Sequence, residues 1–251
     1  MIQIKTPHTA HLGFSLVEMA IVLAIVALLM AGLLPTLSSQ VDQQRTNETR
    51  KQLDEIQQAL IGYAVVHGRL PCPASTTSNG VEDPVGGGTC NHPYDGFVPS
   101  ASLGLSTTDS SGFAVDAWGN HIRYAVTQSD GRAFTTANGM ANTGISSLDP
   151  DLLVCSTAST SGSACSVAGS SLTSLPGVPA VIYSTGKNGG AGGSGADEQE
   201  NPNPNSADND RVFVSRTPTS SSSANGEYDD LVIWVSHGIL INRLVMAGRL
   251  P

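Results

Sequence analysis

The feature that most constrains this chain is an apolar run at residues 14–37, "FSLVEMAIVLAIVALLMAGLLPTL", whose single ionisable side chain is Glu18. A helix of this length rises about 36 Å, and the hydrocarbon core of a bilayer is about 30 Å thick. The run therefore predicts a transmembrane helix. A charge in the bilayer core costs about 2.5–3.5 kcal/mol on insertion scales, so the presence of Glu18 needs an explanation.

The residues before this run form a short polar leader, 1–13, which ends in Gly13. An ordinary secretory signal places its apolar region before the cleavage site, whereas here the order is reversed. A cut between Gly13 and Phe14 keeps the apolar helix in the mature protein. A simple uncleaved membrane anchor would explain neither Gly13 nor this order.

The stretch "GFSLVEMAIVLAIVALLMAGLLP" resembles the processing site and N-terminal helix of the type IV pilin and type II secretion pseudopilin superfamily. The matching residues are Gly13, Phe14, Glu18 and Pro35, where pilins commonly have a helix-kinking proline. The resemblance implies that a prepilin peptidase cleaves after Gly13 and methylates the Phe14 amine. It also implies that the helix leaves the membrane lipid through an inner-membrane assembly platform and packs with other pilin subunits in a filament core.

The filament arrangement offers a role for Glu18. In a filament core, the carboxylate of one subunit can face the positively charged Phe14 amine of a neighbour. Two buried charges then have partners, while an unpaired buried charge is heavily penalised. We therefore expect Glu18 to act in assembly.

The helix is expected to continue through residues 38–67, which are polar but carry one apolar stripe. Spacings of three and four residues indicate an amphipathic helix that packs on a sheet, with a coiled-coil partner as the alternative. Gly68 and Pro71 are expected to end it. The stripe consists of Leu53, Ile56, Leu60, Tyr63 and Val66.

Residues 68–251 are expected to form a β-rich periplasmic head. Short apolar runs separated by polar loops predict strands at 121–126, 179–185, 211–217 and 230–236, and "GILINRLVMAG" predicts a C-terminal helix. The predicted fold class is therefore α+β, a long N-terminal helix with an antiparallel β-sheet head. The motifs "GRLPCPA", "DAWGNHIRY", "STGKNG" and "DDLVIW" also resemble pseudopilins and minor pilins.

Four cysteines behind an export signal indicate two disulfides in an oxidising compartment. Four cysteines allow three pairings, and we favour the two local ones because each closes a single loop. A zinc site is the alternative, but the chain has no C-x-x-C pair and His92 is the one nearby imidazole. The favoured pairs are Cys72–Cys90 and Cys155–Cys165.

A glycine-rich and then acidic loop at 186–210 offers oxygen ligands that suit calcium, which some pseudopilins bind near this place. The loop lacks D-x-D-x-D-G spacing, so a solvated mobile loop is the alternative. Calcium is thus the one candidate cofactor. Its candidate ligands are Asp197, Glu198, Glu200, Asp208 and Asp210.

Other functions find little support. The net charge of −9 and the absence of a basic stripe argue against nucleic acid. Ser184–Lys187 fits S-x-x-K, but no K-T-G follows, so we expect no enzyme. Strand alternation is expected to split Trp118, His121, Arg123 and Tyr124 between two faces rather than join them in one binding surface.

The sequence therefore predicts a structural filament subunit, a minor pilin or pseudopilin. It would cross the bacterial inner membrane once with its head in the periplasm, and then enter a periplasmic pseudopilus or an extracellular pilus. The alternative is a membrane-tethered periplasmic adhesin, binding protein or enzyme that uses the pilin export route.

Overall fold

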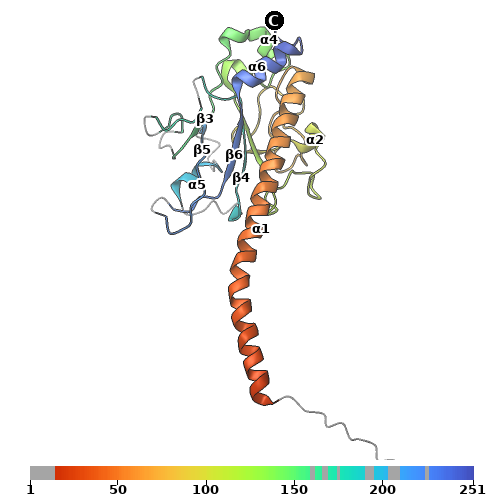
Figure 1. The fold of residues 1–251 in the computed structure, drawn as a ribbon. Helices are drawn as coiled ribbons and strands as arrows, with labels where there is room; N and C mark the ends of the chain where they lie inside the picture. Colours follow the sequence, from red (N-terminus) through yellow and green to blue (C-terminus); the bar gives the residue numbers. More distant parts are fainter. Residues whose placement is uncertain are drawn as a thin grey trace, which may run out of the picture. The chain divides into compact units, whose positions relative to one another are not determined.

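The computed structural model describes residues 15–158, 162–165, 169–173, 176–189, 195–202, 210–223 and 226–251, without the side chains of residues 31–37 (Figure 1). The chain divides into two compact units, residues 1–44 and residues 45–251. Helix α1, Leu16–His67, begins in the first unit and ends in the second. It matches the helix expected from the sequence within two residues at its start.

The described part of the first unit is helical and exposed. Every residue from 16 to 30 has an exposed side chain. Within the portion of the chain that can be described, no helix is long and apolar enough to cross a membrane.

The second half of α1 buries three residues of the predicted stripe in the core of the second unit, whereas Tyr63 is half-buried and Val66, in the last turn of the helix, is 62% exposed. Leu53, Ile56 and Leu60 are at most 3% exposed and join one hydrophobic cluster with residues of the sheet. The helix ends at Gly68, which has a φ of +67° and donates its N–H to the Ala64 carbonyl at 2.8 Å. A left-handed residue at this position stops a helix, and glycine adopts that conformation without a Cβ clash.

The central sheet has four antiparallel strands in the order β1-β2-β4-β6. Successive side chains of a strand point to opposite faces. Tyr124 and Val126 therefore join the cluster that contains α1, while Ala125 joins a second cluster on the opposite face. The strands are β1 Gly96–Phe97, β2 Arg123–Val126, β4 Ala180–Ser184 and β6 Leu231–Val235.

A two-stranded parallel pair covers the face of the sheet opposite α1 (Figure 1). It consists of β3, Leu153–Cys155, and β5, Val212–Val214. The strand expected at 211–217 is therefore not part of the antiparallel sheet. Because both faces of the sheet are covered, all five residues of β4 are buried.

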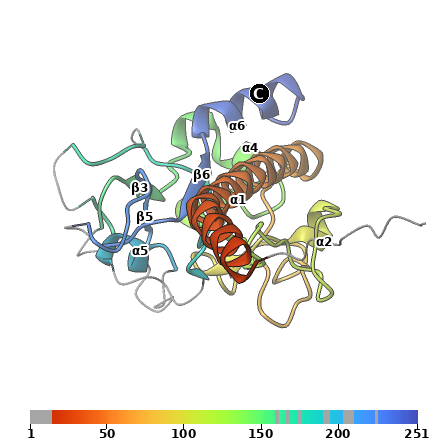
Figure 2. The same ribbon diagram turned by 60° about the horizontal axis from the view of Figure 1, so that its bottom comes forward.

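The C-terminal helix α6, His237–Met246, buries Leu240 and Leu244 in the same cluster as α1. Figure 2 shows the ribbon of α6 near the C-terminal part of α1. This confirms the helix predicted from "GILINRLVMAG". The remaining helical segments are short. They are α2 Ser100–Leu103, α3 Ser129–Arg132, α4 Gly139–Thr143, η1 Ile145–Ser147 and α5 Ala196–Glu200.

Two disulfides close loops of the head, and both are the favoured local pairs. Cys72 bonds Cys90 and Cys155 bonds Cys165, with Cα separations of 5.3 and 5.7 Å. All four cysteines are thus accounted for, which leaves none to hold a zinc ion.

Candidate functional sites

The five carboxylates expected to bind calcium do not gather as one group among the described residues. Asp197 forms an ion pair with Arg216 at 2.7 Å. Asp210 accepts the backbone N–H of Val212 at 2.9 Å. Asp208 lies outside the described residues.

One of the five, Glu198, instead lies beside two carboxylates that the sequence analysis did not select. Glu198 of α5 meets Asp229 and Asp230, the residues that precede β6, with one oxygen of each within 4.8 Å of the others. Glu198 is completely buried and Asp230 is 3% exposed. We call these three residues the carboxylate cluster.

Amide groups hold the carboxylate cluster in place. The Asn188 side chain donates to Glu198 Oε1 at 2.6 Å, and the Asn201 side chain donates to Asp230 Oδ2 at 2.8 Å. The Asn188 backbone N–H donates to Asp229 Oδ2 at 3.2 Å. Among the described residues, Glu198 Oε2, Asp229 Oδ1 and Asn188 Oδ1 are buried oxygens that accept no hydrogen bond.

Burial and mutual repulsion make this cluster unfavourable when it is fully ionised. Burial raises the pKa of the Asp230 carboxyl to about 8. Burial also raises the pKa of Asp229, and the neighbouring Glu198 adds to the rise. A cation bound by oxygens would offset both costs, and oxygen-only ligands suit calcium. The unpartnered oxygens therefore fit a hard divalent cation.

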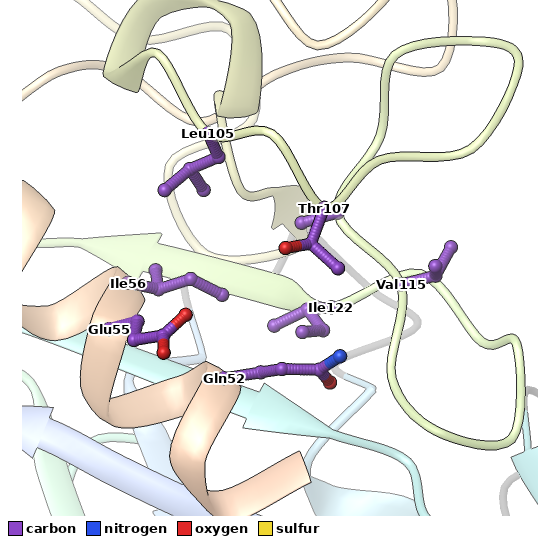
Figure 3. A pocket seen from close by; sticks show the side chains of 8 residues that line it. Gln52, Glu55, Ile56, Leu105, Thr107, Val115 and Ile122 are labelled. Atoms are coloured by element: carbon purple, nitrogen blue, oxygen red, sulfur yellow. The ribbon is translucent and has the colours of Figure 1, made fainter. Parts of the chain in front are cut away.

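A second feature of the head is a narrow apolar hollow between α1 and the loop that precedes β2 (Figure 3). Ile56, Leu105 and Ile122 line it, and Gln52 lies at its side (Figure 3). Its volume is about 20 Å³, which is enough for one water molecule but not for an organic ligand. This hollow therefore does not constitute a substrate site.

Most of the N-terminal residues that are expected to act in processing and assembly lie outside the residues that the structure describes. Gly13 and Phe14 are not among the described residues, and neither is the Pro35 side chain. Glu18 is described and is exposed. Its role in assembly therefore stays a prediction.

Glu18 makes a local contact that the sequence analysis missed. The Ser15 N–H donates to Glu18 Oε2 at 2.9 Å, and the Glu18 N–H donates to Ser15 Oγ at 3.2 Å. This reciprocal pair is a capping box, which satisfies amides that the first turn of a helix leaves without partners. The signal was present in the sequence, since S-x-x-E before an apolar run is its signature.

The apolar side chains between residues 16 and 30 form a large exposed surface. Leu16 is 87% exposed and Leu28 is 78% exposed. Soluble monomers rarely expose contiguous apolar surface on this scale, so such a surface indicates contact with other protein or with lipid.

Residues 9–34 match the family model of the prokaryotic N-terminal methylation motif. The chain carries a prepilin-type signal. This is the signal of type IV pilins and pseudopilins, and it marks a substrate of prepilin peptidase type. No curated protein and no solved structure matches the chain significantly.

The matched residues include the capping box and most of the exposed apolar helix, and a prepilin-type signal is typical of structural subunits that assemble with other pilin subunits. It also points to the membrane and a pilus as the location. The carboxylate cluster lies outside the matched residues, so any role for it rests on its own geometry.

Proposed function

We propose that this protein is a minor pilin or pseudopilin, a structural subunit of a type IV pilus or a type II secretion filament. The observation that carries the proposal is the prepilin-type signal at residues 9–34, which continues into an exposed apolar helix. The α+β head with its own core supports the same role. Before assembly, residues 14–37 anchor the chain in the inner membrane, and afterwards they pack in the filament.

Processing after Gly13 creates the group that Glu18 needs. In the isolated chain, the Glu18 carboxylate accepts a hydrogen bond from the Ser15 amide of its own helix. One carboxylate oxygen stays available to face the Phe14 amine of a neighbouring subunit. The pairing neutralises both charges inside the apolar filament core, where an isolated charge would be heavily penalised.

Intact-mass measurement of the protein from its native membrane tests processing. The expected mature chain lacks residues 1–13 and carries a methylated Phe14 amine. A Gly13→Ala variant would distinguish enzymatic processing from chance proteolysis, because we expect it to retain the leader. A mature wild-type protein that still contains residues 1–13 would overturn the proposal.

Filament incorporation tests assembly. We expect Glu18→Ala to be cleaved normally but to be depleted at least about tenfold from sheared fibres, which corresponds to about 1.4 kcal/mol of lost assembly energy. Glu48→Ala is the matched control, because Glu48 is also exposed on α1. Normal incorporation of the Glu18 variant would instead favour a tethered adhesin, binding protein or enzyme that uses the same export route.

We also propose that the head binds calcium through the carboxylate cluster. This revises the ligand set expected from the sequence, keeping Glu198 and adding Asp229 and Asp230. The supporting observation is that Glu198 is completely buried and its Oε2 accepts no hydrogen bond from a described residue. Such an oxygen lacks the solvation that a carboxylate requires.

Calcium titration of the chelator-treated full chain in detergent tests this site. We expect calcium to raise the melting temperature and Glu198→Gln to abolish the rise. Glu227→Gln is the control, because Glu227 lies close in sequence to the cluster but is not part of it. An unchanged melting temperature in millimolar calcium would overturn the cation proposal and leave the filament proposal intact.

A further inference from the structure

A second pocket of the head lies beside the edge strand of the sheet and is separate from the carboxylate cluster. Its volume is about 290 Å³, close to the lower limit of typical ligand sites. It is lined by Phe97 of β1, Gly119, Asn120 and His121 of the turn before β2, Arg123 of β2, and Thr185.

Strand alternation gives the pocket its chemistry. His121 and Arg123 are two residues apart and share the face that lines the pocket. The intervening Ile122 and the following Tyr124 are buried in the core. Strand alternation thus separates His121 and Arg123 from the buried Tyr124, as expected from the sequence. The two residues that remain near the surface, however, line a pocket together.

Arg123 is held in position and retains unused donors. Its guanidinium lies over the Phe97 ring at 4.6 Å from the centroid, and Nη1 donates to the Asp95 carbonyl at 2.7 Å. No carboxylate in the described part of the chain forms an ion pair with it. The permanent charge of Arg123 and its remaining N–H groups are therefore available to an anion.

His121 is fixed next to Arg123. Its Nε2 lies 2.9 Å from Asp109 Oδ2. Its ring contacts the rings of Phe97 and Phe113, with centroid distances of 5.3 and 4.9 Å. Because these contacts set the orientation of both side chains before a ligand arrives, binding would require little side-chain ordering.

We propose that this pocket binds a carboxylate, carried either by a small dicarboxylic acid or by an acidic side chain of another polypeptide. Arg123 binds the carboxylate through its free N–H groups, in the geometry that guanidinium and carboxylate share. The Phe97 and His121 rings contact the carbon chain. In a protein with a net charge of −9, a fixed and unpaired arginine in a pocket is a specific attraction for anions.

Nuclear magnetic resonance of the ¹⁵N-labelled full chain in detergent tests the proposal with glutarate as the probe and glutaramide as its neutral counterpart. We expect glutarate to shift the Arg123 side-chain signal and the Asn120 amide, with a Kd of about 1 mM, and glutaramide to bind at least about tenfold more weakly. Glutarate that causes no shift at roughly 100 mM would overturn the proposal.

Variants of Arg123 test whether glutarate binds in this pocket. We expect Arg123→Gln to weaken glutarate binding at least about tenfold, and Arg123→Lys to weaken it about threefold because the charge stays but the planar fork is lost. Arg243→Gln is the control, since Arg243 is exposed on α6 away from the pocket lining. Unchanged binding by a folded Arg123→Lys and Arg123→Gln would contradict the assignment to this pocket.

Two capped peptides distinguish the sources of the carboxylate, one with glutamate between glycines and one with glutamine. Binding of the glutamate peptide at the same signals identifies a protein side chain as a ligand, while binding of glutarate alone identifies a small acid. Either result supports a carboxylate site. Equal binding of the glutamine peptide would contradict it. The measurement is independent of processing and assembly.

Discussion

Glu82 is the most heavily bonded carboxylate near the end of α1. Arg69 donates to both of its oxygens at 2.7 Å, and the Cys72 amide donates to it at 3.2 Å. Both partners of this ion pair are nearly buried. Burial alone would raise the pKa of Glu82, but the bonds from Arg69 and the backbone lower it below its usual value.

This lowered pKa makes the stability of the head dependent on pH. The contribution of Glu82 is present above its unfolded pKa, about 4.3, and is lost as the pH falls through the lower folded value. We expect Glu82→Ala to cost about 3–5 kcal/mol at pH 7, because it leaves the buried charge of Arg69 without its carboxylate partner. Denaturant unfolding at pH 7 and pH 3 should show that the difference shrinks in acid.

Glu55→Gln is the control for Glu82→Ala, because Glu55 forms an exposed ion pair with Lys51 on α1. Exposed i,i+4 pairs contribute about 0.3–0.5 kcal/mol. A Glu82→Ala cost no larger than this control would show that the buried pair is not a major source of stability.

Variants of Ser15 and Glu18 distinguish a role in helix capping from a role in filament assembly. Ser15→Ala removes the side-chain cap, which costs about 1 kcal/mol, so we expect amide exchange in the first turn to quicken about fivefold. Glu18→Gln keeps a capping side chain but removes the charge, and should impair filament incorporation instead. Hydrogen exchange and fibre shearing of the two variants should therefore give opposite results. Equal assembly defects would tie the cap itself to assembly.

Among the elements, those with a long repeating pattern could be predicted from the sequence. Leu53, Ile56 and Leu60 identified the buried face of α1, and short apolar runs bounded by polar loops identified β2, β4 and β6. The two-residue β1 and three-residue β3 are too short to show a period. The pairing of β3 with β5 was missed, because parallel pairing between distant segments leaves no local signal.

Prediction of the candidate sites was limited in the same way, because contacts between distant segments leave no local signal in the sequence. Glu198 was predicted because it lies in an acidic loop, whereas Asp229 and Asp230 lie about thirty residues away, at the start of the strand expected at 230–236, and were not selected as ligands. Only the folded chain brings them together. The local disulfide pairs could be chosen because each closes a short loop.

The Cys72–Cys90 disulfide ties the segment after α1 into the main core, where both cysteines are buried. In the chain-entropy model, closing a loop of this length stabilises a fold by about 3 kcal/mol. We expect the double variant Cys72→Ala, Cys90→Ala to lower stability by about that amount in thermal unfolding, with the Cys155–Cys165 bond intact on non-reducing gels. A melting temperature equal to wild type would show that the surrounding packing holds the loop without the bond.

At the scale of the whole molecule, the core belongs to one of the two units. Every buried residue in the described part of the chain lies between Thr49 and Leu250. In the described part of the chain, the unit before Arg45 therefore contributes exposed apolar surface, and the unit from Arg45 onward contributes the packed interior. Assembly and folding are predicted to be separable.

A fragment comprising residues 45–251, exported to the periplasm by an ordinary secretory signal, tests this separation. It keeps both disulfides and the carboxylate cluster, so we expect it to fold and to melt within about 3 °C of the full chain in detergent, a difference of about 1 kcal/mol. It lacks the prepilin-type signal and the exposed apolar helix, so it should be absent from sheared fibres. A fragment that fails to fold, although the full chain folds in detergent, would mean that residues 1–44 also stabilise the head.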